Sequence, residues 1–182
     1  NEARSIGAVV SDLPRVERVL VVDGGSADGT PERARAAGAE VVVERRRGYG
    51  TAVLAGLRVL APEPPDVVVI LDADHADRPD LFERLLEPIR QGRADLVLSD
   101  RTRTAEPGAL TRTQRLGNQL ATALMARATG HRYRDLGPFR AIRWDSLQRL
   151  GMVDATWGWN VEMQCKAIRS GLRVVEVALP YA

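Results

Sequence analysis

The chain has one cysteine, Cys165, and one lysine, Lys166, among its 182 residues. A single cysteine excludes an intrachain disulfide and a cysteine-based metal site, which is compatible with a reducing compartment such as the bacterial cytoplasm. No apolar run reaches the roughly 18 to 20 residues that a membrane span requires, and no signal-peptide pattern is present. We therefore expect a cytoplasmic protein, with any membrane contact peripheral and at the inner face.

The positive charge is carried almost wholly by arginine, and the formal net charge is only +2. Arginine binds phosphate groups through paired hydrogen bonds, whereas duplex nucleic acid usually requires a concentrated basic stripe. No such stripe extends beyond residues 45–47. This balance favours an anionic small molecule over nucleic acid as the ligand.

Length and patterning predict one α/β domain over 1–182. Of the residues, 45% are hydrophobic and 27% are charged, as is ordinary for a globular protein with a sizeable core. Helical and strand periodicities alternate, which indicates a mostly parallel sheet flanked by helices. Strands are predicted at 19–22, 41–43, 67–71, 96–98, 139–142 and 172–179. Helices are predicted at 6–13, 30–38, 48–60, 79–90, 116–124 and 160–169, with a substrate-facing loop at 101–113.

The strongest chemical signal is an apolar strand, "VVVIL", that runs straight into "DADHAD". Ligands of open α/β sheets bind at the carboxyl ends of the strands, and two carboxylates there can hold a hard divalent cation that bridges a diphosphate. Asp72 and Asp74 form that pair. The alternative is that these acidic residues end the strand and cap the next helix, which explains Asp77 and Asp80 better than it explains the pair.

A second signal is "VVDGGSADGT", an apolar strand that ends in Asp23 before a glycine-rich turn. The glycines allow close backbone approach, and the carboxylate can accept hydrogen bonds from a nucleobase or ribose. The glycine spacing matches neither the dinucleotide fingerprint G-x-G-x-x-G nor a phosphate loop. A plain strand-to-helix turn remains the alternative.

Together these segments resemble the family 2 glycosyltransferases of the GT-A fold, and most closely the branch that contains dolichol-phosphate mannose synthase and bacterial polyprenyl-phosphate glycosyltransferases. The match extends over nearly the whole chain. Its motifs are Asn1-Glu2 for the end of "Y-N-E", "VVDGGSADGT", Gly48-Tyr49-Gly50 for "G-K-G", Asp72-Ala73-Asp74 for the metal-binding D-x-D, "DLGPFRAI" for "D-x-x-S-G-F-R-A", and the closing "WGWNVEMQCKAIRSGLRVVEV".

The resemblance implies a division of roles, with a nucleotide-sugar half at 1–100 and an acceptor half at 101–182. Asp74 would be catalytic, and with Asp72 it would hold Mg²⁺ or Mn²⁺. The donor side would include Glu2, Asp23, Gly25, Asp28, Gly48, Asp72 and Ala73. The acceptor side would include Arg101, Asp135 and Arg140.

Four departures from the family pattern concern the donor site and the sheet. Gly24 stands where many relatives have a second aspartate, and Tyr49 replaces the lysine of "G-K-G". Ala76 stands where the polyprenyl-phosphate branch often has a metal-binding glutamine. The apolar strand expected before Asn1-Glu2 is also absent, so we expect an unusual sheet or a segment outside the chain.

Each of the remaining candidate site residues could have either a functional or a purely structural role. Glu162 could be a general base, or it could form an ion-paired helix face with Lys166. Trp159, like Trp157, could stack on a sugar or pack in the core. Arg112 and Arg115 could clamp a lipid phosphate on a helix that touches the membrane surface, or they could be solvated.

The sequence therefore predicts an inverting glycosyltransferase that uses a UDP- or GDP-linked sugar and an acceptor such as a polyprenyl phosphate. A sugar-phosphate nucleotidyltransferase is one rival, although no "G-x-G-T-R" run follows the first strand. A non-catalytic module that binds nucleotide sugars is the other. Metal-dependent transfer would separate the three.

Overall fold

The computed structural model describes residues 1–105 and 111–181, so 106–110 of the predicted 101–113 loop lie outside it. The first elements alternate helix and strand: α1 (Ile6–Asp12), β1 (Leu20–Asp23), α2 (Thr30–Ala36), β2 (Glu40–Val43), α3 (Tyr49–Leu60) and β3 (Val67–Ile70). A 3₁₀ turn, η1 (Pro79–Leu81), leads into α4 (Phe82–Arg90) and β4 (Leu96–Asp100). The chain continues with α5 (Arg112–Thr129), β5 (Arg140–Arg143), α6 (Trp144–Leu150), α7 (Trp159–Arg169) and β6 (Val174–Ala178).

The strands form two groups, β1-β2 and β3-β5-β4-β6. β1 pairs with β2 in parallel, and β4 pairs with β6 in parallel. β5 runs antiparallel to both of its neighbours, so the larger group is mixed rather than mostly parallel. Because β5 and β6 pair with β3 and β4, residues from both halves of the chain build the same sheet.

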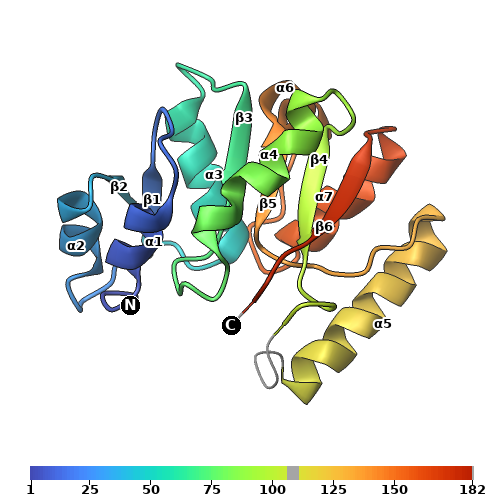
Figure 1. Ribbon diagram of the computed structural model, residues 1–182, viewed down its shortest axis with the longest axis horizontal. Helices are drawn as coiled ribbons and strands as arrows, with labels where there is room; N and C mark the ends of the chain where they lie inside the picture. Colours follow the sequence, from blue (N-terminus) through green and yellow to red (C-terminus); the bar gives the residue numbers. More distant parts are fainter. Residues whose placement is uncertain (106–110, 182) are drawn as a thin grey trace.

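The side chains of the four-stranded group alternate between two covering layers, as the period of a strand requires. Val97 lies in a cluster with Phe82, Leu85 and Ile89 of α4. Leu96 and Leu98 lie in a second cluster with residues of α3, α6 and α7. Figure 1 shows the resulting arrangement, with α2 at one end of the molecule and α5 projecting from the other.

The unusual sheet that the sequence predicts is present as a gap between β1 and β3. A cavity of about 610 Å³ lies there, lined mainly by apolar side chains of α1, β1, α3 and β3. Each of the two strands pairs on one side only among the described residues. The hydrophobic residues of β1 are consequently only half-buried.

The sequence pattern does not predict α6, although Gly151, in the left-handed region at φ 55°, is the stop signal that ends it. Among the described residues, no helix combines the length and the apolar character needed to cross a membrane.

Candidate functional site

The candidate site lies where β1, β3 and β4 end, and residues 1–5 tie two of these ends together. The Glu2 amide donates to the Thr30 hydroxyl at 2.8 Å, beside the loop that follows β1. The Ser5 hydroxyl donates to the Ala73 carbonyl at 2.7 Å, within the turn that follows β3. The predicted donor residues Glu2 and Ala73 are thereby brought to the same edge of the sheet.

Asp23 organises the turn that follows β1. Its Oδ2 accepts hydrogen bonds from the amides of Gly25 at 2.7 Å and Ser26 at 2.8 Å. Burial opposes ionisation, but these bonds hold the pKa of the Asp23 carboxyl below its ordinary value. Gly25 has φ 90°, a conformation that suits glycine. The turn reading of Asp23 and Gly25 is thus confirmed, and their contact with a donor stays a prediction.

Asp28 is held by hydrogen bonds within the protein, and its contact with a donor stays a prediction. Its Oδ1 accepts from the Thr30 amide and hydroxyl, and its Oδ2 accepts from the Ala3 amide at 3.1 Å. The Thr30 hydroxyl is the main reason that the pKa of Asp28 falls to about 2. Both oxygens are engaged within the protein, so Asp28 holds the N-terminal segment against the β1 loop.

Asp72 and Asp74 follow β3 and project from one turn. Asp74 is exposed, and its Oδ1 accepts from the Ala76 amide at 3.0 Å. Burial raises the pKa of Asp72, and the negative charge of Asp74 raises it further. His75 between Asp74 and Ala76 adopts a left-handed φ of 66°, and its Nε2 lies 2.8 Å from Asp12 Oδ2 of α1. This contact ties the carboxylate turn to a helix.

The carboxylate pair fits a hard divalent cation by its chemistry. Burial is the main reason that the pKa of Asp72 is raised, and repulsion from the like charge of Asp74 adds to it; a cation between the two carboxylates would relieve that repulsion. Among the described residues, no histidine, cysteine, aspartate or glutamate joins the pair to make a set of three. Any remaining ligands would be oxygens of the donor or of water.

Gly48 and Gly50 bring the start of α3 against the loop at 153–156. The Gly50 amide donates to the Thr156 carbonyl at 3.0 Å, and the Thr51 amide donates to the Ala155 carbonyl at 3.0 Å. A side-chain Cβ on Gly48 or Gly50 would overlap a backbone carbonyl of this loop. Gly48 is thus needed for a close backbone approach, and its predicted contact with the donor remains untested.

Replacing Gly50 with alanine should lower the free energy of unfolding by about 3 kcal/mol, because a backbone carbonyl must move to admit the methyl group. Gly117→Ala is the matched control: it lies within α5 with open space around it, and it should raise stability by about 0.5 to 1 kcal/mol. Urea denaturation of the two variants measures both changes. Equal free energies of unfolding for the Gly50 and Gly117 variants would contradict the close approach of Gly50 to the loop at 153–156.

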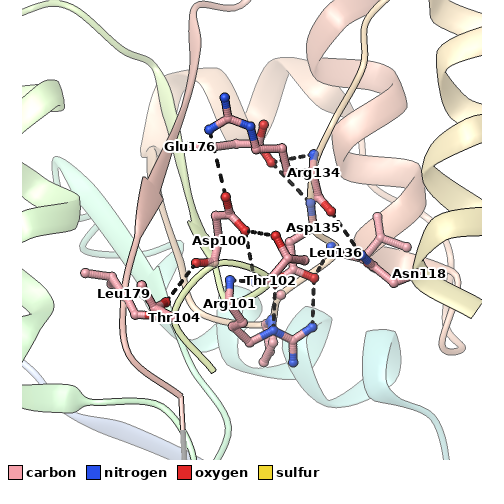
Figure 2. Close-up of polar contacts among 12 residues, drawn as sticks. Asp100, Arg101, Thr102, Thr104, Asn118, Arg134, Asp135, Leu136, Glu176 and Leu179 are labelled. Carbon is pink, nitrogen blue, oxygen red and sulfur yellow. Dashed lines mark hydrogen bonds and ion pairs between the residues drawn. The ribbon is translucent and has the colours of Figure 1, made fainter. Parts of the chain in front are cut away.

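Arg101 follows β4 and is held by Asp135, as Figure 2 shows. Its Nε and Nη2 donate to the two carboxylate oxygens of Asp135 at 2.8 and 3.0 Å, and its amide donates to Oδ2 at 3.0 Å. Asp135 is 1% exposed, and its carboxylate is engaged with Arg101 and with the Leu136 amide. Asp135 therefore positions Arg101, which corrects the expectation that it contacts the acceptor itself.

The Arg101 guanidinium also lies over an aromatic ring near the end of the chain. Its carbon lies 4.9 Å from the centroid of the Tyr181 ring. Burial disfavours its charge, but the hydrogen bonds and charge of Asp135 raise its pKa above the ordinary value. Arg101 is therefore a permanently cationic group held beside the carboxylate turn.

Arg140 and Trp159 are both 0% exposed, so neither reaches an acceptor directly. Arg140 donates to the carbonyls of Gly137 and Pro138, and burial lowers its pKa. Trp159 lies in the main hydrophobic cluster, which confirms the core-packing alternative for this residue. The tryptophan that is exposed is Trp157, which stacks on Tyr49 with ring centroids 5.9 Å apart.

Glu162 has the ion-paired position rather than that of a free base. Its Oε1 lies 2.7 Å from Lys166 Nζ, and Oε2 accepts from the amides of Val153 at 3.2 Å and Asp154 at 2.8 Å. Burial works against the charged form, but the bonds from Lys166 and these amides hold the pKa of Glu162 below its ordinary value. Glu162 therefore positions the loop that carries Trp157.

The two remaining arginines lie on α5. Arg115 is exposed, as the solvated alternative expects. Arg112 is the first residue of α5, and its side chain lies outside the described part of the structure.

Asp77, for which the sequence pattern predicts only a capping role, lies buried near Arg101 and the carboxylate pair. It is 2% exposed, and its Oδ2 has no hydrogen-bond partner among the described residues. Burial raises its pKa to about 7, although the charge of Arg101 opposes this. Its backbone forms a bridge with Tyr181, near the end of the chain. Four acidic residues within "DADHADRPD" were a signal, but only the tertiary structure shows which one is buried.

Comparisons with known proteins agree with one another. Residues 1–151 match the family model described as glycosyl transferase family 2. The glycosyltransferase AglJ of Haloferax volcanii is 34% identical over 100% of this chain, which spans 60% of the length of AglJ. A dolichyl-phosphate hexose transferase of the same organism is 37% identical, over 100% of this chain and 78% of that protein.

A solved structure is similar over the whole fold. Glucosyl-3-phosphoglycerate synthase from Mycobacterium tuberculosis, in complex with Mn²⁺, UDP-glucose and phosphoglyceric acid, superimposes with a TM-score of 0.75 at 26% identity. The superposition covers 100% of this chain and 67% of that one.

Proposed function

Because the chain belongs to glycosyltransferase family 2, we propose that it transfers a sugar from a nucleoside diphosphate to a polyprenyl phosphate, with inversion at the anomeric carbon. The observation that carries this proposal is the Asp72–Asp74 turn after β3, together with the cationic Arg101, which Asp135 holds directly after β4. One group suits a metal-bound diphosphate, and the other suits an acceptor anion.

The donor half comprises residues 1–100, with Glu2, Asp23, Gly25 and Ala73 around the nucleoside. Asp72 and Asp74 would hold Mg²⁺ or Mn²⁺, which when bound supplies positive charge to the leaving diphosphate. The Mn²⁺ and UDP-glucose of the similar synthase structure support this assignment and a uridine donor. Gly48 and Asp28 act indirectly, by fixing the loops on either side.

The acceptor half comprises residues 101–182, with Arg101 as the group that meets the acceptor anion. Asp135 occupies Nε and Nη2 of the guanidinium in a side-on pair, which leaves Nη1 to donate to a phosphate oxygen. The hexose transferase that acts on dolichyl phosphate supports a lipid phosphate as the acceptor. A lipid acceptor places the reaction at the cytoplasmic face of the membrane.

A phosphate acceptor also agrees with the state of Glu162. An anionic oxygen of the acceptor attacks the anomeric carbon, and the bond from that carbon to the diphosphate breaks, with the electron pair leaving on the diphosphate. Such an oxygen carries no proton to be removed, whereas a hydroxyl acceptor requires a base. Glu162, the base candidate, is instead engaged by Lys166 and two amides.

The test is a transfer assay with purified protein, a panel of UDP- and GDP-sugars, and a short-chain polyprenyl phosphate. We expect one donor to be used, EDTA to reduce transfer to background, and added Mn²⁺ or Mg²⁺ to restore it, because the metal would supply positive charge to the leaving diphosphate. Transfer that resists EDTA would refute the metal. Donor binding without transfer would indicate a binding module, and formation of a nucleotide sugar from a nucleoside triphosphate would indicate a nucleotidyltransferase.

A further inference from the structure

We propose that α5 docks on an anionic lipid surface through a stripe of three leucines; this rests on the proposed lipid-phosphate acceptor. The stripe comprises Leu116, Leu120 and Leu124, which are 67%, 61% and 58% exposed. Residues four apart lie one above the other on a helix, so the three side chains form one continuous apolar face. Contiguous exposed apolar faces usually mark a surface that binds something.

The leucine face is exposed because the opposite face of α5 is fixed to the body. Met125 is 3% exposed and belongs to the main hydrophobic cluster, and Thr122 is also buried. Asn118 donates to the Arg134 carbonyl at 3.0 Å and accepts from the Leu136 amide at 3.0 Å. In Figure 1, α5 projects from the end of the molecule. The exposure of the three leucine side chains leaves them free to meet a flat surface.

The charges around the stripe select a membrane over a second copy of the chain. Between residues 111 and 134 the sequence contains no aspartate or glutamate, but it contains arginine at positions 112, 115, 127, 132 and 134. Each basic residue near an anionic membrane adds about 1 kcal/mol of attraction. A symmetric contact between two copies of α5 would instead oppose arginines to arginines.

The helix is also connected to the acceptor arginine, as Figure 2 shows. The Asn118 side chain of α5 accepts a hydrogen bond from the Leu136 amide, and the same amide donates to Oδ1 of Asp135 at 2.7 Å. Asp135 in turn holds Arg101. The helix that carries the leucine face is therefore joined, through its opposite face, to the group that we assign to the acceptor phosphate.

The test is flotation of the protein with vesicles of phosphatidylcholine, with and without phosphatidylglycerol. We expect the wild type to float with the phosphatidylglycerol vesicles, to be released by salt, and to ignore phosphatidylcholine alone. The double variant Leu120→Glu, Leu124→Glu should lose at least about tenfold in partitioning, because it removes two apolar side chains and adds two negative charges. Val153→Glu, at a residue that is 74% exposed elsewhere, should bind as the wild type does.

A soluble acceptor separates this inference from the proposed function. With a short-chain polyprenyl phosphate, the double variant should keep wild-type transfer, because Leu120 and Leu124 are exposed side chains outside the candidate site. Undiminished vesicle binding by the double variant, or no binding by the wild type, would overturn the inference while transfer stays intact. A wild-type dimer by light scattering that the double variant abolishes would also overturn it, in favour of a second copy. No transfer to any lipid phosphate by the wild type would instead refute the proposed function.

Discussion

Replacing Asp74 with asparagine should abolish metal-dependent donor binding and lower transfer by at least about a hundredfold. Asparagine keeps the size and the oxygen that accepts from the Ala76 amide, but it removes the negative charge. The expected loss corresponds to about 2.7 kcal/mol of transition-state stabilisation, which is modest for the removal of a metal ligand. Calorimetric titration with the preferred nucleotide sugar, with and without Mn²⁺, measures the affinity for the donor and its dependence on the metal.

The matched control for this substitution is Asp80→Asn. Asp80 lies six positions further along the same acidic segment, is exposed, and pairs with Arg78 at 2.7 Å. The chemical change is identical, so the control should keep donor binding and transfer near wild-type values. If Asp74→Asn binds the donor with unchanged metal dependence, Asp74 is not a metal ligand and the reading of the turn fails.

Replacing Asp135 with alanine should lower the free energy of unfolding by about 3 kcal/mol. The change leaves the Arg101 guanidinium, whose side chain is only 14% exposed, without its carboxylate partner. Removing one member of a buried pair usually costs about 3 to 5 kcal/mol, and the partial exposure of Arg101 sets the lower end. The amides of Arg101 and Leu136 lose an acceptor as well.

Urea denaturation measures this loss, and Asp145→Ala is its control. Asp145 pairs with Arg143 at 3.3 Å, but its side chain is 63% exposed, so its removal should cost less than about 1 kcal/mol. A double-mutant cycle with Arg101→Ala should return a coupling energy, because the two side chains contact each other. Equal losses for Asp135→Ala and Asp145→Ala would show that the pair does not hold the acceptor side together.

Predictions that depended on neighbouring residues along the chain agree well with the structure. The strand at 67–71 and the carboxylates after it are visible because an apolar run followed by acidic residues is a local pattern. The turn at Asp23 is local too, since its hydrogen bonds reach only two and three residues ahead. The same holds for Glu162 and Lys166, which are one helical turn apart.

Predictions that depended on distant segments were incomplete. Asp135 and Arg101 are 34 residues apart, and no local pattern says that one holds the other. β5 runs antiparallel to both β3 and β4, and its own residues do not encode that direction. Trp159 carries the same ring as Trp157, yet one is 0% and the other 81% exposed.

The sequence by itself determined the carboxylate pair, the glycine-rich turn, the alternation of helices and strands, and through them the family. It could do so because each of these is written in residues a few positions apart. Only the tertiary structure decided which polar groups are engaged within the protein, namely Asp28, Asp135 and Glu162. The tertiary structure also decided that the leucine face of α5 is exposed and that Asp77 is buried. Burial depends on what packs against a residue rather than on its neighbours in the chain.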